Sequence, residues 1–347
     1  MSVPKPSIGV PVPCVSDSTP LVDLRMVSKR FHKKPDMAHR LAIKMNLAKV
    51  PPTVHAVDRA SIHINPGEVV GLVGESGCGK STLGRLAVGL HGLSEGRRFW
   101  RGKDIDQMDA PEKKQTGLKM QMVFQDPYAS LNPRMRVNDI VGEAAVAHGL
   151  VAARDQQGFV AQLLQRVGLE PSVANRFPHQ FSGGQRARIG IARALALQSE
   201  FLVCDEAVAA LDVSIQAQVI NLFMQLREEL RLAYLFISHD LSVVRHISDR
   251  VVIMYLGRVV EMADSVTLFE RPNHPYSQAL LAEVPTLAVS KRTFVAIRGE
   301  IPSPLHPPSG CHFHPRCPHA MERCRVEAPV LRAIGAEHQS ACHLNDA

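Results

Sequence analysis

Residues 74–81, G-E-S-G-C-G-K-S, place glycines, a lysine and a hydroxyl in the pattern G-x-x-x-x-G-K-[ST]. Glycines allow backbone N–H groups to turn toward a phosphate, while Lys80 supplies a positive charge and Ser81 a hydroxyl for Mg²⁺. An apolar run at 68–73 precedes the loop, and a helical pattern at about 81–90 aims its positive end at the same anion. This order disfavours a plain Gly-rich turn and predicts a nucleoside triphosphate site made by Gly74, Glu75, Ser76, Gly77, Cys78, Gly79, Lys80, Ser81 and Thr82.

A second apolar run, 201–204, ends in two carboxylates, Asp205 and Glu206. In such an arrangement Asp205 can hold Mg²⁺ and Glu206 can polarise an attacking water. Burying the pair without a cation would be costly. Surface acids that cap a strand are the simpler alternative, but beside a phosphate loop the pair favours triphosphate hydrolysis.

Residues 181–186, F-S-G-G-Q-R, resemble the signature sequence of ATP-binding cassette (ABC) ATPases, and a helical pattern follows them. A hydroxyl and N–H groups at a helix start form an anion site that needs no lysine. In that family the site meets the γ-phosphate bound by a partner subunit, so the resemblance implies that ATP joins two cassettes face to face. The residues concerned are Ser182, Gly183, Gly184 and Gln185.

Four further positions match motifs of the same family. Gln125 corresponds to the Q-loop glutamine, which senses Mg²⁺ or water and lies near the transmembrane partner. Asp212 corresponds to the D-loop aspartate at the dimer interface, and His239 to the switch histidine that contacts the γ-phosphate. Phe31 corresponds to the aromatic residue that stacks on adenine, although a Phe at a strand end is more often a core residue. The resemblance thus implies Glu206, His239 and Gln125 as catalytic residues and Ser81, Gln125 and Asp205 as Mg²⁺ ligands.

Two positions depart from the family pattern. Members usually have Pro after the catalytic Glu and Ser or Thr two residues later, whereas this chain has Ala207 and Ala209. Neither position carries charge in the reaction, so we still expect an ATPase, with a slower or differently coupled cycle as an alternative.

The elements that must position these residues follow from alternating patterns. Strand-like runs recur at 21–26, 60–64, 69–73, 120–124, 201–204, 234–237 and 251–254. Helical patterns separate them, and a continuous one at about 133–197 predicts a helical subdomain inserted between strands. The alternation predicts an α/β fold with a mostly parallel sheet. The resemblance makes it an ABC cassette of the P-loop NTPase class with a small Cys-rich C-terminal extension.

Composition suggests three segments. Residues 1–20, with five prolines, are expected to form a flexible leader. The ATPase domain is expected at 21–270, with an inserted loop at 33–53. After residue 270 Pro, His and Cys become frequent, which predicts a second small domain at 271–347.

Charge and hydropathy narrow the possible partners and cellular location of the protein. The chain has 347 residues and a formal charge of +7, but Lys and Arg are spread without a block, so charge alone does not indicate a nucleic-acid partner. No run approaches the roughly 18 apolar residues of a spanning helix, and the first residues do not read as a signal peptide. We expect a soluble, cytoplasmic protein that attaches peripherally to the inner face of the cell membrane.

Three C-terminal stretches look like the extension of oligopeptide/dipeptide transporter ATPases. They are H-P-Y-S-Q-A-L-L-A-E-V-P at 274–285, G-E-I-P-S-P at 299–304 and G-C-H-F-H-P-R-C-P at 310–318. That branch imports peptides, and sometimes nickel or other small solutes. The resemblance implies two membrane permease subunits, an extracytoplasmic substrate-binding protein and, because this chain has one cassette, a second and homologous ATPase chain, with no nucleic-acid partner.

Four late cysteines could hold a metal. Five, six and seventeen residues lie between Cys311, Cys317, Cys324 and Cys342, which is neither a zinc-ribbon nor a tight ferredoxin spacing. In this branch such cysteines resemble ligands of a 4Fe-4S cluster. Nearby His312, His314 and His319 keep Zn²⁺ as an alternative, and free buried thiols are the third.

Two other functions fit parts of the pattern. A soluble ABC ATPase acting on ribosomes or DNA would suit the positive charge, but such proteins generally carry two cassettes or a long coiled coil. A regulatory cassette that binds ATP without hydrolysing it would suit Ala207 and Ala209, but Lys80, Glu206 and His239 are all present.

Overall fold

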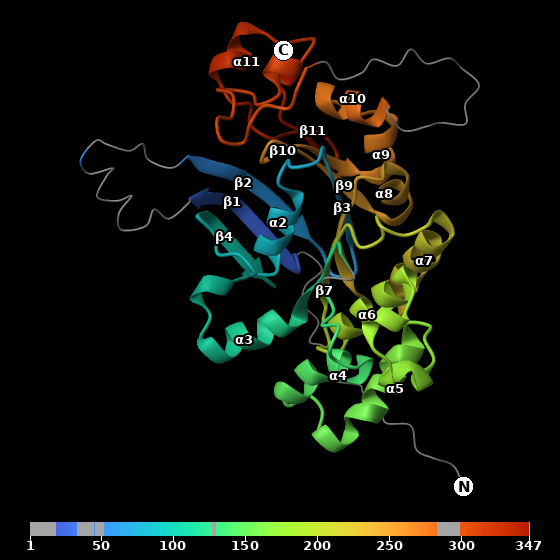
Figure 1. Ribbon diagram of the computed structural model, residues 1–347. Coiled ribbons are helices and arrows are strands. Elements are labelled where there is room, and N and C mark those ends of the chain that lie inside the picture. The colour runs from blue at the N-terminus through green and yellow to red at the C-terminus, as the bar shows by residue number, and fades with distance from the viewer. Residues whose placement is uncertain (1–18, 33–44, 46–51, 127–129, 283–298, 347) are drawn as a thin grey trace.

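The computed structural model describes residues 19–32, 45, 52–126, 130–282 and 299–346, which form two sheets surrounded by helices (Figure 1). The larger sheet has eight strands in the order β11-β12-β10-β9-β3-β8-β7-β6. They are β3 (Val69–Val73), β6 (Met120–Val123), β7 (Phe201–Asp205), β8 (Ala233–Ile237), β9 (Arg250–Tyr255), β10 (Arg258–Asp264), β11 (Arg332–Gly335) and β12 (His338–Ser340).

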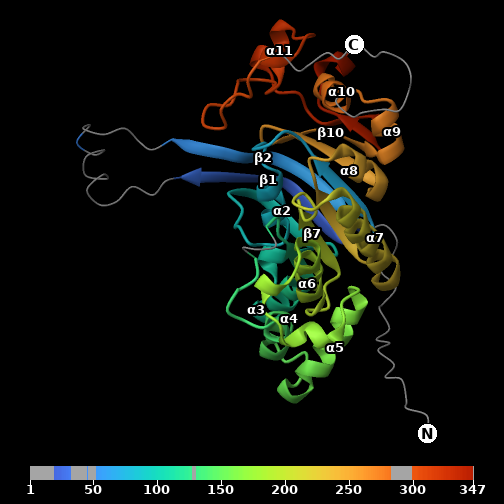
Figure 2. The same ribbon diagram turned by 45° about the vertical axis from the view of Figure 1, so that its right-hand side comes forward.

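Five neighbouring strands of this sheet, β9-β3-β8-β7-β6, run parallel. Every residue of β3, β7, β8 and β9 is buried, and all but Asp205 and Arg250, at strand ends, are apolar or glycine. These strands therefore appear in the sequence as apolar runs. Helix α2 (Lys80–Ala87) covers one face, while α7 (Val213–Leu230) and α8 (Leu241–Ile247) lie on the other side (Figure 2). The predicted α/β fold with a mostly parallel sheet is confirmed for this part.

The smaller sheet is antiparallel and contains β1 (Val22–His32), β2 (Thr53–Ile64), β4 (Glu95–Trp100) and β5 (Lys103–Asp104) in the order β2-β1-β4-β5. The sequence predicted shorter first strands, at 21–26 and 60–64, because their outer halves lack a continuous apolar run. It gave no sign of β4, whose run E-G-R-R-F-W is half charged. In the predicted inserted loop at 33–53, Met45 and Pro52 are described and Thr53 begins β2, while the other residues lie outside the described ones.

Helices fill the interval that was expected to be helical. They are α4 (Val137–Ala147), α5 (Gln156–Arg166) and α6 (Gly183–Leu195), joined by the short 3-10 turns η2 (Ala153–Asp155), η3 (Pro171–Asn175) and η4 (Pro178–Gln180). Buried Leu164, Val167 and Ile189 belong to the same apolar cluster as Phe223 and Phe236, so these helices share one core with α7 and β8. Another helix, α3 (Ala110–Lys119), follows the turn η1 (Ile105–Gln107) and leads into β6.

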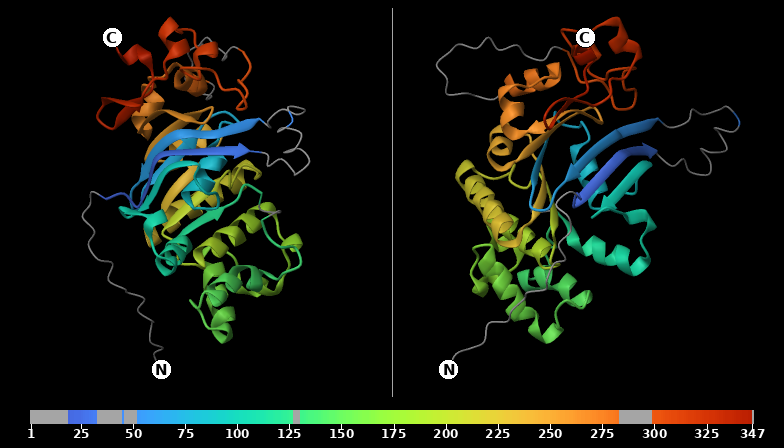
Figure 3. Two further views of the ribbon diagram at one scale, coloured as in Figure 1. Left: turned by 90° about the vertical axis from the view of Figure 1, so that its left-hand side faces the viewer. Right: turned by 180° about the vertical axis from the view of Figure 1, so that it is seen from behind.

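The C-terminal extension continues the large sheet. After α9 (Ser265–Glu270) and α10 (Pro275–Ala282), it contains η5 (His314–Arg316), α11 (Glu322–Val326), β11, β12 and η6 (His343–Asp346). Strand β12 pairs with β10 through Glu261 and Met262. The extension lies at the end of the molecule opposite α4 and α5 (Figure 3). The boundary at residue 270 stays a prediction, and residues beyond it add two strands to the ATPase sheet.

A buried carboxylate ties this extension to β10. Glu261 is fully buried, and its carboxylate accepts hydrogen bonds from the backbone N–H groups of Asn273 (2.7 Å) and His274 (2.8 Å). The ring of His338, on β12, lies 2.7 Å from the same carboxylate. Because a buried carboxylate without partners is strongly unfavourable, these contacts fix the start of α10 and strand β12 against β10.

Candidate active site

The sheet order collects the predicted catalytic residues at one edge. The phosphate loop, residues 74–81, follows β3, and His239 follows β8. Asp205 is the last residue of β7 and Glu206 comes directly after it, while Gln125 follows β6. These four strands are neighbours in the order β3-β8-β7-β6 and run parallel, so their carboxyl ends meet. Ligands of open α/β sheets bind at this edge.

The phosphate loop closes around its lysine. Lys80 is 5% exposed, and its ammonium group donates hydrogen bonds to the carbonyl oxygens of Gly74 (2.7 Å) and Glu75 (3.0 Å). Gly79 precedes α2 with φ 109°, and a side chain there would lie 2.1 Å from the Ala56 carbonyl oxygen, so glycine is required. No side chain caps the first turn of α2, which leaves its N–H groups available to an anion.

Two of the three expected Mg²⁺ ligands, Ser81 and Asp205, are in direct contact, whereas the third, Gln125, contacts Glu206. Ser81 donates a 2.7 Å hydrogen bond from its hydroxyl to the Asp205 carboxylate, which is 1% exposed. Burial raises the pKa of Asp205, against the hydrogen bond from Ser81 and the charge of Arg85, which lower it. A buried oxygen pair of this kind, beside a phosphate loop, fits a hard divalent cation.

Two other predicted catalytic residues, Gln125 and His239, approach the carboxylate of Glu206. Its backbone lies in the left-handed region at φ 47°, and its N–H donates to the Ile237 carbonyl of the neighbouring strand at 3.0 Å. Gln125 donates a 2.6 Å hydrogen bond to one oxygen of the Glu206 carboxylate, and His239 Nδ1 lies 3.6 Å from the same oxygen. The Glu206 side chain is 18% exposed, so it can reach a water at the sheet edge.

The signature residues lie on a different element, at the start of α6, where Ser182 and Gln185 are exposed and Gly184 is buried. Ser182 begins α6, and its hydroxyl accepts the N–H of Gln185 at 3.3 Å while the Gln185 side chain accepts the N–H of Ser182 at 3.0 Å. This reciprocal capping box was not anticipated, although S-x-x-Q is its known pattern. Gly184 is required for packing, because a side chain there would lie 2.3 Å from Ile215 on α7.

Three other predicted residues, Phe31, Asp212 and Cys78, differ in their exposure and contacts. Phe31 is 37% exposed and packs edge-on against His91 at 5.5 Å, with the Lys29 ammonium 5.2 Å from its ring. Its exposure suits a stacking platform better than a core residue. Asp212 is exposed and precedes α7 without capping it. Cys78 is 4% exposed, and burial raises the pKa of its thiol, so it serves packing.

Alanines that depart from the family pattern lie in the turn after β7. Ala207 is 5% exposed, and the N–H of Ala209 donates to the Glu206 carbonyl at 3.0 Å. The turn that carries Glu206 is therefore closed by a backbone hydrogen bond and needs neither a proline nor a hydroxyl to form.

Two contacts to the phosphate loop were missed from the sequence. The Tyr276 hydroxyl, from α10, accepts the N–H of Glu75 at 2.9 Å. The Arg316 guanidinium, from η5, donates to both oxygens of the Glu75 carboxylate at 2.7 and 2.9 Å. Their only signal was that they belong to the H-P-Y and H-P-R-C-P stretches, which gave no spatial information.

The four late cysteines line one narrow pocket in the extension. Its walls also include His274, Phe313, His314 and His343. Burial raises the pKa of Cys311 to about 11, and the other three thiols act in the same direction, which reflects their proximity. Among the described residues, no three His, Cys, Asp or Glu are grouped as ligands of a single metal ion.

None of the helices in the described residues combines the length and apolar character of a membrane span.

Comparisons with known proteins agree with this geometry. Residues 57–209 match the ABC transporter family model, and residues 260–324 match the model for the C-terminal region of oligopeptide/dipeptide transporters. The oligopeptide transport ATP-binding protein AppF of Bacillus subtilis is 51% identical over 84% of this chain and 90% of its own length. The di/tripeptide transport ATP-binding protein DppF of Pseudomonas aeruginosa is 45% identical over 89% and 95%, respectively.

Among solved structures, the chain resembles a dimeric ATP-binding cassette, MJ0796, in a post-hydrolysis state bound to ADP and Pi. The TM-score is 0.59 and the identity 26%, covering 70% of this chain and 98% of that one. The expected cassette fold is confirmed.

Asp205 generates a prediction that separates stability from function. Because burial raises its pKa, the ionised carboxylate weakens the nucleotide-free fold at neutral pH, and this cost disappears as the pH falls below that pKa. Asp205→Asn should raise the melting temperature of the nucleotide-free protein at pH 7.5 by roughly 2–4 °C, the shift that about 1 kcal/mol produces. The same variant should lose the further stabilisation that Mg²⁺ with ATP gives the wild type.

Thermal unfolding with and without Mg²⁺ and ATP measures both effects. Asp109→Asn is the matched control, since Asp109 caps α3 and asparagine caps equally well. An Asp205→Asn protein that keeps the full Mg²⁺-dependent stabilisation would contradict the assigned ligand role.

Proposed function

We propose that this chain, which belongs to the ABC transporter family of ATP-binding proteins, drives the uptake of di- and oligopeptides across the cell membrane by hydrolysing ATP. The chain is an ABC ATPase, and ATP with Mg²⁺ is its expected nucleotide. The single observation that carries the peptide assignment is the pairing of a cassette with the oligopeptide/dipeptide extension, at 45–51% identity to peptide transport proteins over most of the chain.

The residue roles follow from the edge of the sheet. Lys80 and the N–H groups at the start of α2 bind the β- and γ-phosphates. Ser81, Asp205 and Gln125 hold Mg²⁺, which neutralises charge on the phosphates when bound. Glu206 orients and polarises the attacking water, while Gln125 and His239 hold its carboxylate in position at 2.6 and 3.6 Å.

A second cassette completes the site. Ser182, Gly183, Gly184 and Gln185 lie at the start of α6, an element separate from β3 and α2, which flank the phosphate loop. Because the N–H groups of Ser182 and Gln185 are used in the capping box, it is the N–H groups of Gly183 and Gly184 and the Ser182 hydroxyl that can serve the triphosphate of another subunit, with Asp212 at the same interface. We assign that subunit to a homologous but distinct chain. Two permease subunits and, through them, an extracytoplasmic binding protein complete the importer, with this chain at the cytoplasmic face.

The cysteine pocket supports a 4Fe-4S cluster better than Zn²⁺. All four cysteines line it, and a cluster takes one thiolate at each of four irons, so its ligands are spread more widely than those of a single ion. Among the described residues no three His, Cys, Asp or Glu form a single-ion group, so the proposal rests on the four cysteines sharing one pocket. Such a cluster would supply four thiolate bonds across a segment whose only regular elements are short.

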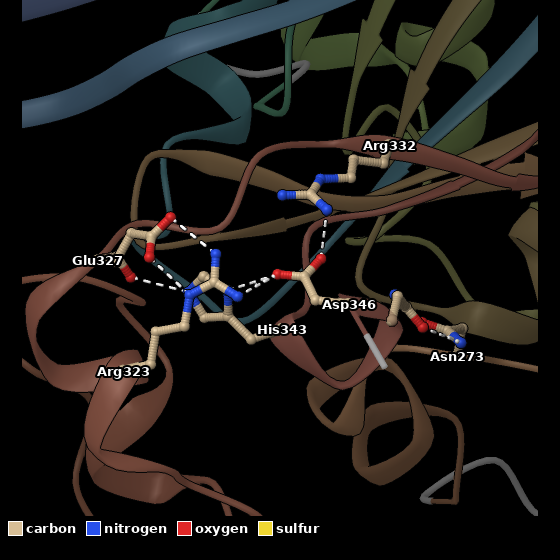
Figure 4. A network of polar contacts seen from close by, with 7 residues as sticks. Asn273, Arg323, Glu327, Arg332, His343 and Asp346 are labelled. Carbon is tan, nitrogen blue, oxygen red and sulfur yellow. Dashed lines mark hydrogen bonds and ion pairs between the residues drawn. The ribbon is translucent and has the colours of Figure 1, made fainter.

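A polar network braces two of these cysteine segments (Figure 4). The His343 ring lies 3.0 Å from the Glu327 carbonyl and 3.2 Å from the Asp346 carboxylate. Arg323, beside Cys324 on α11, donates to Glu327 at 2.6 and 2.9 Å and to Asp346 at 2.7 Å. The network thereby holds the segment of Cys324 against that of Cys342, as outer partners do around metal sites.

The transport assignment is tested on the assembled complex. The chain should co-purify from membranes with two permease subunits, and in proteoliposomes its ATPase activity should rise with peptide and binding protein. Stimulation by nickel and not by peptide would replace the solute. Co-sedimentation with ribosomes, without permeases, would overturn the transporter role.

Glu206→Gln should bind ATP with unchanged affinity but lose about 10²-fold or more of its turnover, the contribution typical of a positioned base. The amide keeps the shape of the side chain and removes its charge. ATP binding and phosphate release measure the two effects. Glu200→Gln, at the opposite end of β7, is the matched control, and wild-type turnover in Glu206→Gln would refute the role.

Anaerobically purified wild type should be brown and contain about four irons and four sulfides per chain, as thiolate ligation of a 4Fe-4S cluster requires. Cys324→Ser should lose most of both. Cys204→Ala, which removes a buried thiol of β7 outside the pocket, should keep them. Colourless protein with one zinc per chain would contradict the cluster.

A further inference from the structure

Glu75, the second residue of the phosphate loop, is held by the C-terminal extension at three atoms. Its N–H donates to the Tyr276 hydroxyl at 2.9 Å, and its two carboxylate oxygens accept from Arg316 at 2.7 and 2.9 Å. Its carbonyl in turn accepts from the Lys80 ammonium at 3.0 Å. Glu75 thus links the extension directly to the lysine that meets the phosphates.

The Arg316 side chain is itself held in place. It is 5% exposed, and its hydrogen bonds to Glu75 raise the pKa of the guanidinium further above its usual value. The Tyr255 hydroxyl lies 3.4 Å from the same group. Behind it Tyr255, Tyr276 and Phe313 pack with ring centres 4.7–5.4 Å apart. A forked pair on such a rigid aromatic base fixes Glu75 with little freedom.

The rest of this half of the loop has little support of its own. Ser76 and Gly77 are exposed, and Gly77 has open space where a side chain would lie. Within the loop, the Cys78 N–H reaches the Glu75 carbonyl at 3.3 Å. The position of residues 75–77 therefore depends on how Glu75 is anchored.

Charge gives Arg316 a second effect. A carboxylate in a phosphate loop repels a triphosphate unless a cation neutralises it, because like charges a few ångströms apart interact strongly in a partly buried site. Arg316 provides that cation for Glu75. Without it, the loop would carry an uncompensated negative charge and a loosened backbone at the same time.

We propose that Arg316 and Tyr276 are positioning residues for ATP, which hold the phosphate loop through Glu75 and so make ATP affinity depend on the C-terminal extension. The inference rests on the ATP site and holds whichever ligand the four cysteines bind. It assigns the H-P-Y and H-P-R-C-P stretches a role in nucleotide binding.

Arg316→Met in the full chain should raise the Kd for ATP with Mg²⁺, measured with a fluorescent ATP analogue, about tenfold. In the assembled transporter the KM for ATP should rise similarly while kcat at saturation stays within about twofold, because uniform binding is lost. Arg316→Lys, which keeps the charge but not the fork, should weaken binding about threefold, and it replaces Arg316→Met if that variant does not fold.

The charge argument has its own test. Adding Glu75→Gln to Arg316→Met removes the unpaired carboxylate and should bring the Kd back to within about threefold of wild type. A general loss of stability would not be rescued in this way. A double variant that binds ATP no better than Arg316→Met would overturn the proposal, as would wild-type affinity in folded Arg316→Met.

Arg250→Met is the matched control. Arg250 forms a similarly buried fork with Glu68, at 2.9 and 3.4 Å, beside the opposite end of β3. Its loss should lower stability and leave the Kd for ATP unchanged. If Arg250→Met weakened ATP binding as much as Arg316→Met, the effect would reflect destabilisation of β3, and the positioning role would be wrong.

Discussion

The structure depends on the buried ammonium group of Lys80, for which the described part of the chain supplies no carboxylate partner. Lys80 is 5% exposed, and its described oxygen contacts are backbone carbonyls of the loop it belongs to. Carbonyl dipoles orient the charge but do not neutralise it, so the site is completed by an anion. The uncapped first turn of α2 adds N–H groups directed at the same place.

Opposite this positive centre, the fold gathers negative groups that need a cation. Asp205 is buried, and among the described residues its carboxylate accepts a hydrogen bond from the Ser81 hydroxyl alone. Glu206 follows it in a strained backbone conformation. Each group is unfavourable alone, and a triphosphate with Mg²⁺ satisfies both. The site therefore gives up stability in the empty protein and recovers it when nucleotide binds.

The C-terminal extension is part of the same mechanical unit. It shares a sheet with the ATPase through β12 and β10, anchors α10 on the buried Glu261 carboxylate, and grips the phosphate loop at Glu75. Cys317, which lines the cysteine pocket, directly follows Arg316 in the chain. Whatever orders the cysteines thus also orders the residue that holds the loop.

Local chemistry was readable from the sequence because it depends on residues close together in the chain. A fixed short spacing defines the phosphate loop, the carboxylate pair at the end of β7 and the signature at the start of α6. The buried parallel strands are recognisable as apolar runs. The sequence did not predict β4, which is rich in charged residues, or the full length of β1 and β2.

Only the tertiary structure decided that Gln125 and His239 meet at Glu206, because the order of strands in a sheet is set by packing across it. It alone brought Arg316 to Glu75 across 241 residues, since an ion pair between distant segments leaves no periodicity or spacing in the chain.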